Sequence, residues 1–364
     1  LGEKTFFNKI KMLKPGHIVE VNKKKIAISL YKDSIPTKII NDNYEDAVNK
    51  TKYLLEKSIK SQLVSDVPIG VFLSGGIDSS AIASLASKHS SKKINTYSVD
   101  FSYAKDQSEL FLAKLLSKKI GSNHHEMNIS TNNIFGIIEA LINAHDQPFG
   151  DPANIPIYMM CKELNGDPKV ILQGDGGDEV FGGYDRYLRI KNKKYYGYFY
   201  KIIKPFNNLI SKNSALHRSL RTLNAFEENK NDILMARIMS QVPYGDSINS
   251  IFSKSFLNNL KKINPYSIYI DYYNKYKSKG LLQSALYTDI SIILPDVYFE
   301  KVDRASMANS IEVRVPMLDN NLAEYLLSLP ANMKLRFGKK SILKSALKGL
   351  VPEEILSSPK KGFG

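Results

Sequence analysis

VFLSGGIDSS, residues 71–80, is the stretch that decides the fold of this chain. A short apolar run leads into the polar turn Ser74-Gly75-Gly76, and an amphipathic helix pattern begins at Ile77. Two adjacent glycines let the backbone approach an anion, and the first N–H groups of a helix point toward it. Asp78 lies in the first helical turn, where a carboxylate is stabilised and can hold a divalent metal. The stretch therefore predicts a strand, a glycine turn and a helix that together cradle a phosphate.

This motif differs from two other phosphate-binding loops. It is not a Walker A loop, because no Gly-Lys-Ser/Thr follows, and it lacks the glycine spacing of the dinucleotide fingerprint. Taken alone, a Gly-Gly pair after a strand is also compatible with an ordinary turn that binds no ligand.

A second glycine loop, residues 173–179 (QGDGGDE), follows the apolar run 170–172 and carries three carboxylates. If the two loops lie side by side, Asp78 and Asp178 could chelate one Mg²⁺, which prefers one or two carboxylates together with phosphate oxygens. That number of carboxylates fits MgATP. An isolated Asp-Gly-Gly-Asp sequence is equally compatible with a surface turn whose acids are solvated.

Three blocks of the sequence resemble one family. SGGIDSS (74–80) resembles the SGGxDS signature of the ATP-pyrophosphatase (PP-loop) enzymes, which bind the pyrophosphate part of ATP and transfer AMP. GDGGDEVFGGY (174–184) resembles the second signature of the asparagine synthetase family, and residues 303–319 resemble that family again. Three blocks in the family's order are far more specific than one. The similarity runs from about residue 6 to residue 364 and is weakest between about 191 and 283.

The resemblance implies a role for each matching residue. The first loop would hold the pyrophosphate and the metal, and the second loop would supply the other metal carboxylate. The backbones at two strand ends would bracket the adenine, and a further pair would contact ATP. The residues of the first loop are Ser74, Gly75, Gly76, Asp78, Ser79 and Ser80, and the metal carboxylate of the second loop is Asp178. The residues that would bracket the adenine are Phe72 and Val99, and the further ATP-contacting pair is Gln173 and Gly174.

Two residues would act in catalysis. Lys340 matches the family lysine that stabilises the charge developing during adenylation and amide formation, and a fixed cation at such a place is worth several kcal/mol. Outside that context Lys340 would be an ordinary exposed lysine. Lys339 is the alternative match to the family lysine if the alignment is shifted by one residue. Asp175 falls where many asparagine synthetases carry Glu, at a position important after the acyl-adenylate forms. The shorter Asp leaves the identity of the substrate open.

The remaining matching segments carry weaker indications. The pair His124-His125 resembles the family's His-His-Glu edge strand, and a zinc site is disfavoured because no cysteine or third histidine is near. Loop 146–152 matches a loop near the ATP site, where a structural turn and a ligand contact are equally compatible. The resemblance places five charges on the helical side of the active cleft, whereas a buried salt-bridge network fits them equally well. These are Asp303, Arg304, Glu312, Arg314 and Asp319.

Apolar patterning predicts an α/β fold. Along the first half of the chain, segments whose apolar residues recur at helical spacing alternate with short apolar runs typical of buried strands. This alternation indicates a doubly wound parallel sheet with ligands at the carboxyl ends of its strands. The resemblance implies the PP-loop (adenine nucleotide alpha hydrolase-like) type, and beyond residue 184 the patterns predict a largely helical C-terminal part. Strands are expected at 69–73, 94–99, 124–129 and 170–172, and helices at 44–65, from 77, at 106–120 and at 134–145.

The chain is predicted to have three parts. Segments 18–21 and 25–30 alternate around a turn, as in a β-hairpin. Residues 11–20 resemble the final hairpin of the glutaminase (Ntn-type) domain that precedes the synthetase domain in this family, and the body of that domain, with its N-terminal cysteine, is missing here. The expected parts are a hairpin remnant of the glutaminase domain at 1–33, a polar linker at 34–43 and a synthetase-like ATP-pyrophosphatase domain at 44–364.

Composition narrows the class of protein. With 364 residues and 43% hydrophobic content the chain is globular, no apolar run approaches the ~18 residues needed to span a bilayer, and no signal peptide opens it. The single cysteine, Cys161, lies in an apolar helical stretch and fits a buried side chain in a reducing cytoplasm. The net charge of +15 comes from scattered lysines without an arginine stripe, which disfavours a nucleic-acid partner.

The resemblance implies ATP-dependent amidation of a carboxylate. The carboxylate attacks the α-phosphorus of MgATP, giving an acyl-adenylate and pyrophosphate, and ammonia derived from glutamine then displaces AMP. Aspartate is the expected substrate, and another carboxylate such as a surface-sugar uronic acid is the alternative. A PP-loop tRNA-modifying enzyme and a non-catalytic nucleotide-binding module are the other classes considered. A homodimer is compatible with the sequence.

Overall fold

The computed structural model describes most of the chain. A parallel sheet at its centre consists of β3 (Ile69–Phe72), β4 (Asn95–Phe101), β5 (Asn123–Ile129), β6 (Val170–Leu172) and β7 (Glu312–Arg314). In register, Val71 of β3 faces Thr96 of β4 on one side and Leu172 of β6 on the other. The described residues are 2–23, 25–33, 35–101, 108–129, 133–209, 220, 223–240, 252–260 and 264–359.

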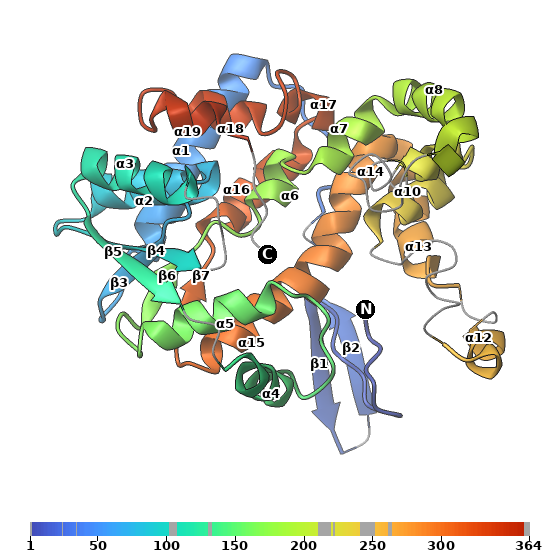
Figure 1. Cartoon of the computed structure of the whole chain (residues 1–364), viewed down its shortest axis with the longest axis horizontal. Helices are drawn as coiled ribbons and strands as arrows, with labels where there is room; N and C mark the ends of the chain where they lie inside the picture. Colours follow the sequence, from blue (N-terminus) through green and yellow to red (C-terminus); the bar gives the residue numbers. More distant parts are fainter. Residues whose placement is uncertain are drawn as a thin grey trace.

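The strand order is β5-β4-β3-β6-β7, so the chain first builds outward from β3 and then returns to the other side of it (Figure 1). This is the arrangement of doubly wound α/β folds, in which a ligand crevice opens where the strand order reverses. The reversal here lies between β3 and β6. The predicted doubly wound sheet is confirmed, and its reversal point lies between the two glycine loops.

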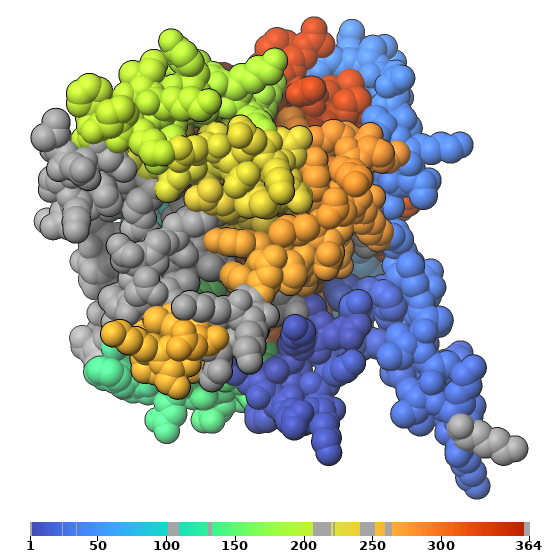
Figure 2. All heavy atoms as spheres, turned by 90° about the vertical axis from the view of Figure 1, so that its right-hand side faces the viewer, coloured from blue at the N-terminus to red at the C-terminus, as the bar shows by residue number. Residues whose placement is uncertain are grey.

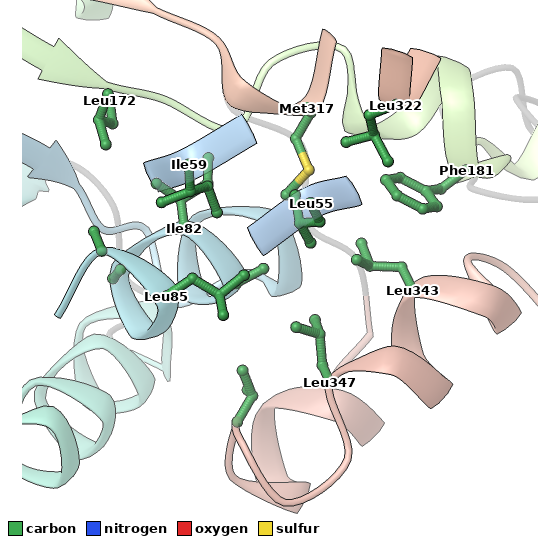
Figure 3. Close-up of a cluster of buried hydrophobic side chains, with 14 of the residues drawn as sticks. Leu55, Ile59, Ile82, Leu85, Leu172, Phe181, Met317, Leu322, Leu343 and Leu347 are labelled. Atoms are coloured by element: carbon green, nitrogen blue, oxygen red, sulfur yellow. The ribbon is translucent and has the colours of Figure 1, made fainter. Parts of the chain in front are cut away.

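Helices pack on both faces of the sheet, because successive side chains of a strand point to opposite sides. Val71 and Leu73 pack in one apolar cluster, and Phe72 packs in another. Figure 3 shows the first cluster, where Leu55 and Ile82 lie among side chains from several helices. The flanking helices are α1 (Tyr44–Gln62), α2 (Ile77–His89) and α3 (Ser108–Ile120) for the first cluster, and α4 (Ile134–His145), α5 (Asn154–Glu163) and α15 (Glu300–Met307) for the second.

The predicted elements of the first half agree with the structure within a few residues. The helix predicted over 106–120 is described from Ser108, since residues 106 and 107 lie outside the described part of the chain. Cys161 is buried in α5, and burial raises the pKa of its thiol to about 12. A thiol with so high a pKa is a poor nucleophile, so Cys161 is a packing residue.

The second half is largely helical, as predicted. α14 (Leu281–Thr288), the π-helical segment η4 (Asp289–Phe299) and α15 follow one another without a break and reach from the helical part to the sheet (Figure 1). The other helices with α-helical geometry are α6 (Gly177–Phe181), α7 (Asp185–Lys191), α8 (Lys193–Ile203), α10 (Asn231–Met239), α12 (Lys254–Leu260), α13 (Ser267–Tyr276), α16 (Asn320–Ser328), α17 (Ala331–Lys334), α18 (Ser341–Ala346) and α19 (Glu353–Ser357). Among the helices of the described residues, none has the length and apolarity needed to cross a membrane.

The N-terminal hairpin is confirmed as β1 (His17–Asn22) paired with β2 (Lys25–Leu30). It projects from the body of the protein (blue, lower right in Figure 2), and its apolar side chains are exposed: Val21, Ile26 and Ile28 are each more than half exposed. The following segment packs against the helical part, since Ile35 is buried beside Tyr287. Part of the segment predicted as a linker therefore packs against the helical part.

One buried lysine leads to a stability prediction. Lys334, at the end of α17, is fully buried, and its Nζ has no hydrogen-bond partner among the described residues. Burial lowers the pKa of its amine to about 7. Between about pH 7 and the ordinary lysine value of 10.5 the unfolded chain binds a proton that the folded chain does not, so stability rises with pH across this window.

We expect Lys334→Met to raise the free energy of unfolding by about 1–3 kcal/mol at neutral pH, because the buried amine lacks a hydrogen bond. The gain should shrink as pH rises toward 10. Urea unfolding at several pH values measures both effects, with the exposed Lys348→Met as the control. A loss of stability in Lys334→Met would show that the amine has a stabilising partner.

Candidate active site

A cleft of about 990 Å³ opens at the carboxyl ends of β3, β4 and β6, where the strand order reverses. The loop that follows β3 and the loop that follows β6 line it, together with residues from α3, α5, η4, α15 and the start of α18. Doubly wound folds bind their ligands in this position.

The loop after β3 can receive an anion. Gly75 has φ +81°, and a Cβ there would lie 2.4 Å from the carbonyl oxygen of Glu109, so a side chain is excluded. Gly76 precedes α2 and provides no side chain to cap it, which leaves the N–H groups of the first turn for a ligand. The Ser74 and Ser79 hydroxyls lie 3.1 Å apart and brace the turn.

The loop after β6 packs directly on the first turn of α2. A Cβ on Gly174 would lie 2.8 Å from the Asp78 Cβ, and one on Gly177 would lie 2.6 Å from Asp78 Oδ1. Such distances exclude side chains at both positions, so the glycines are what allow the two loops to meet. This contact brings Asp178, in the first turn of α6, toward Asp78.

Lys340 joins these two carboxylates. Its Nζ lies 2.6 Å from Asp178 Oδ1 and also contacts Asp78 Oδ2. Burial would lower the pKa of this amine, but the two carboxylates outweigh burial and raise the pKa above its ordinary value. Lys340 precedes α18 with a left-handed backbone, φ +56°, which directs the residue from the helix start into the cleft wall. Lys339 instead pairs with the exposed Asp185, 2.7 Å away.

Asp175 and Gln173 carry buried oxygen atoms that have no hydrogen-bond partner in the part of the chain that the structure describes. These atoms are Asp175 Oδ2 and Gln173 Oε1. Burial raises the pKa of the Asp175 carboxyl to about 6, while Lys301 opposes this shift and the nearby Asp178 and Asp78 add to it. At neutral pH Asp175 is therefore mostly ionised, in a place where an unpaired acceptor is costly.

The cleft gathers the predicted site residues with one exception. Ser80 is fully buried in α2 and does not line it. The predicted residues that do line it are Phe72, Ser74, Gly75, Gly76, Asp78, Ser79, Val99, Gln173, Gly174, Asp175, Asp178 and Lys340.

Lys301, which lines the cleft, forms an ion pair that the sequence did not indicate. Lys301 of α15 lies 2.9 Å from Asp151 Oδ2, and both side chains are nearly buried. The Lys301 Nζ also lies 4.7 Å from the centre of the Tyr298 ring. Asp151 belongs to loop 146–152, which was expected near the ATP site, whereas no local pattern marks Lys301 or Tyr298.

A buried acid was also not assigned a role. Glu179 accepts a hydrogen bond from the Tyr184 hydroxyl at 2.7 Å, and both residues line the cleft. Burial, reinforced by Asp178, raises the pKa of Glu179 to about 8, so its carboxyl group is mostly neutral at pH 7. The Arg186 guanidinium lies 4.1 Å from the centre of the Tyr184 ring and pairs with Asp289. This network holds Tyr184 in place.

The five charges of the third block are not among the residues that line the cleft. Glu312 and Arg314 belong to β7, an edge strand that the sequence did not predict. Arg314 donates to the carbonyl oxygens of Gln62 and Val64, both at 2.8 Å, and so ties the sheet edge to the end of α1. Asp319 caps α16.

Comparisons with known proteins agree with these blocks. Residues 50–364 match the family model described as asparagine synthase. A putative asparagine synthetase (glutamine-hydrolyzing) of Mycobacterium tuberculosis is 28% identical over 373 residues, covering 99% of this chain and 55% of that protein. Asparagine synthetase (glutamine-hydrolyzing) 1 of Bacillus subtilis is 30% identical over 335 residues, covering 90% of this chain and 51% of that protein. The chain thus spans about half the length of the curated relatives it matches.

Among solved structures, similarity is found to the NH3-dependent NAD synthetase of Campylobacter jejuni, at 14% identity and a TM-score of 0.26, covering 61% of this chain and 93% of that one. A U34-tRNA thiolase of Methanococcus maripaludis gives 14% identity and a TM-score of 0.31, covering 68% and 80%. Because the family model covers residues 50–364, which include both glycine loops and Lys340, the chain belongs to the asparagine synthase family.

Proposed function

We propose that this chain catalyses ATP-dependent amidation of a carboxylate through an acyl-adenylate, with release of AMP and pyrophosphate. The observation that carries the proposal is the convergence of Asp78, Asp178 and Lys340 at the point where the strand order reverses. Two carboxylates and one fixed cation suit a metal–polyphosphate ligand that is cleaved beside the cation. Family membership supports the same chemistry.

ATP would lie across the two loops. Phe72 and Val99 would flank the adenine, Gln173 and Gly174 would contact the nucleotide, and the loop after β3 would hold the pyrophosphate at the N-terminus of α2. Of the predicted pyrophosphate residues, Ser80 is the least suitable, because it is buried away from the cleft.

The donor set fits Mg²⁺. Asp78 and Asp178 converge on one cationic nitrogen, so a cation is already accommodated between them. Among the described residues no group of three or more His, Cys, Asp or Glu side chains could hold a metal, and Mg²⁺ would take its remaining ligands from phosphate and water. When bound, Mg²⁺ would neutralise phosphate charge and orient the pyrophosphate leaving group.

Lys340 would then serve the chemical step. An oxygen of the substrate carboxylate attacks the α-phosphorus, and the bond from that phosphorus to the pyrophosphate oxygen breaks. The ammonium of Lys340 stabilises the negative charge that develops on the phosphoryl oxygens. In the second step ammonia adds to the acyl carbon and AMP leaves. Asp175 is proposed to act after the adenylate has formed.

Ammonia is proposed to come from glutamine through a glutaminase domain preceding residue 34, of which 1–33 would be the last hairpin and 34–43 the linker to the domain at 44–364. Two observations support this. The hairpin exposes apolar side chains, as a surface covered by another domain does, and the relatives described as glutamine-hydrolyzing are about twice as long as this chain. A cytoplasmic location and a homodimer belong to the same proposal.

The proposal predicts a specific dependence on the acceptor. With MgATP and ammonium, pyrophosphate should form only when a carboxylate acceptor is added, and aspartate should give asparagine. Parallel reactions contain a uronic acid or tRNA in place of aspartate. Release with a uronic acid alone would change the substrate assignment, release that requires tRNA would replace the amidation proposal, and no release with any acceptor would contradict catalysis.

A further inference from the structure

Helix α8 has one apolar face that packs against the rest of the protein. Tyr196, Tyr200 and Ile203 recur along this face at helical spacing. They pack in a cluster with Phe226 and Leu234, and the ring centres of Tyr196 and Phe226 are 5.6 Å apart. The inner face of α8 therefore already supplies the apolar contacts that hold the helix in place.

A second apolar face of α8 is exposed. Its side chains also recur at intervals of three and four residues, so they form one stripe along the helix. Three of the four are more than half exposed, and the fourth, Phe199, has its ring nearly parallel to that of Tyr195 with the ring centres 6.3 Å apart. The members of this outer stripe are Tyr195, Tyr198, Phe199 and Ile202.

The sequence around the outer stripe is basic. From Arg186 to Phe226 it contains ten lysine or arginine residues and no aspartate or glutamate. Lys194 and Lys201 belong to α8 and are exposed, and within the described part of the chain neither forms an ion pair. Helical spacing places both lysines along one edge of the outer stripe. An apolar stripe edged by unpaired cations is complementary to a partner that is both anionic and partly apolar.

The outer stripe belongs to a helix at the margin of the molecule. α8 lies at the upper edge in Figure 1 and in Figure 2, whereas the hairpin β1–β2 lies at the lower edge in both views. The proposed glutaminase domain would continue from the hairpin. The outer stripe is therefore at the opposite end of the protein from the surface to which that domain would attach.

We propose that α8 docks this protein on the surface of an anionic lipid bilayer. Aromatic rings with apolar bodies prefer the boundary between headgroups and hydrocarbon, and an amphipathic helix can lie in the plane of that boundary. The two lysines would contact the negatively charged headgroups. This inference does not depend on the proposed amidation.

Two other occupants fit the outer stripe less well. Single-stranded nucleic acid binds aromatic platforms by base stacking, but Ile202 has no ring, and the rings of Tyr195 and Phe199 lie against each other. A second copy of this chain would bring a second basic segment to the same interface, and like charges placed together are unfavourable.

Sedimentation with lipid vesicles tests the docking. One set of vesicles contains only phosphatidylcholine, and in the other set about a third of the phospholipid is phosphatidylglycerol, which supplies the negative charge. The whole chain should bind the anionic vesicles at least about tenfold more tightly than the neutral ones. Raising the ionic strength to about 0.5 M should reduce this difference, because salt screens exposed charges.

Two double variants separate the charge from the apolar contact. Lys194→Gln with Lys201→Gln should weaken binding to the anionic vesicles about 25-fold, since each lysine near such a surface contributes about a factor of five. Tyr198→Ser with Ile202→Ser should weaken it at least about tenfold, because apolar area no longer enters the bilayer. All four side chains are exposed, so Tm should change little in either variant.

Matched controls are found on α1, which also exposes an aromatic residue and lysines. Tyr53→Ser, and separately Lys57→Gln with Lys60→Gln, should bind vesicles as the unmodified protein does. A comparable loss in these controls would show that binding follows the general positive charge of the protein and not α8, which contradicts the proposal.

Other outcomes would also overturn the proposal. These are binding to neither set of vesicles, equal binding to both, and binding that neither double variant weakens. Poly-uridine RNA and analytical ultracentrifugation test the other occupants. RNA binding or self-association that both double variants abolish, without vesicle binding, would assign the outer stripe to RNA or to a second copy of this chain.

Discussion

Asp78→Asn should lower acceptor-dependent pyrophosphate release at least about 1000-fold, because several kcal/mol of charge stabilisation would be lost and each 1.36 kcal/mol is a factor of ten. Asparagine preserves the size of the side chain at the first turn of α2. It carries no negative charge, however, and a neutral amide is a weak ligand for Mg²⁺. Initial rates of pyrophosphate release at saturating MgATP measure the effect.

The matched control is Asp185→Asn. Asp185 also pairs with a lysine of the cleft, Lys339, but its side chain is 64% exposed and lies outside the two glycine loops. An exposed pair of this kind contributes little, so the control should retain activity within about twofold. Near-normal release by Asp78→Asn would remove Asp78 from the proposed metal site. A second measurement, the increase in Tm caused by MgATP, should be smaller in Asp78→Asn than in the control.

The two glycine loops could be located from sequence because all of their determinants are local. In each, a short apolar strand is followed by glycines and a carboxylate within ten residues, as in 71–80 and 170–179. Parallel-sheet topology then requires the loops to emerge at the same edge. The structure adds why the glycines are needed, since a Cβ on Gly174 or Gly177 would collide with Asp78.

Strand β7 was missed for a physical reason. It has three residues, of which Glu312 and Arg314 are charged, so neither an apolar run nor a period of two can be recognised. Its identity as a strand comes from pairing with β6, whose sequence position is about 140 residues earlier. The segment was therefore included in the largely helical C-terminal part. The resemblance placed its charges beside the cleft, but they are not among the residues that line it.

Lys301 and Tyr298 could not be predicted for a related reason. They reach the cleft because α14, η4 and α15 form one uninterrupted helical run from Leu281 to Met307. Pro295 lies within this run, where proline ordinarily ends or kinks a helix. The segment around it, η4, is π-helical. Tertiary packing decides which side chains of this run face the cleft. The local sequence pattern does not contain that information.

Lys340→Met should lower the rate of pyrophosphate release by about 10²–10³, which is the effect of removing one preorganised group from a developing anion. Lys339→Met is the control for the alternative register, and it should retain most activity because Lys339 contacts the exposed Asp185. Comparable losses in both variants would mean that Lys340 contributes only to the general positive charge of the cleft.

A binding measurement separates the two roles of Lys340, as catalytic cation and as counter-ion to Asp78 and Asp178. Its ammonium lies between these carboxylates, so methionine leaves two acids facing each other and Tm should fall. Mg²⁺ without nucleotide should then raise the Tm of Lys340→Met more than that of the unmodified protein, since the cation no longer competes with an ammonium for the same oxygens. If Mg²⁺ restores stability but not pyrophosphate release, the lysine charge itself is required in the adenylation step. Restoration of both would reduce Lys340 to a counter-ion.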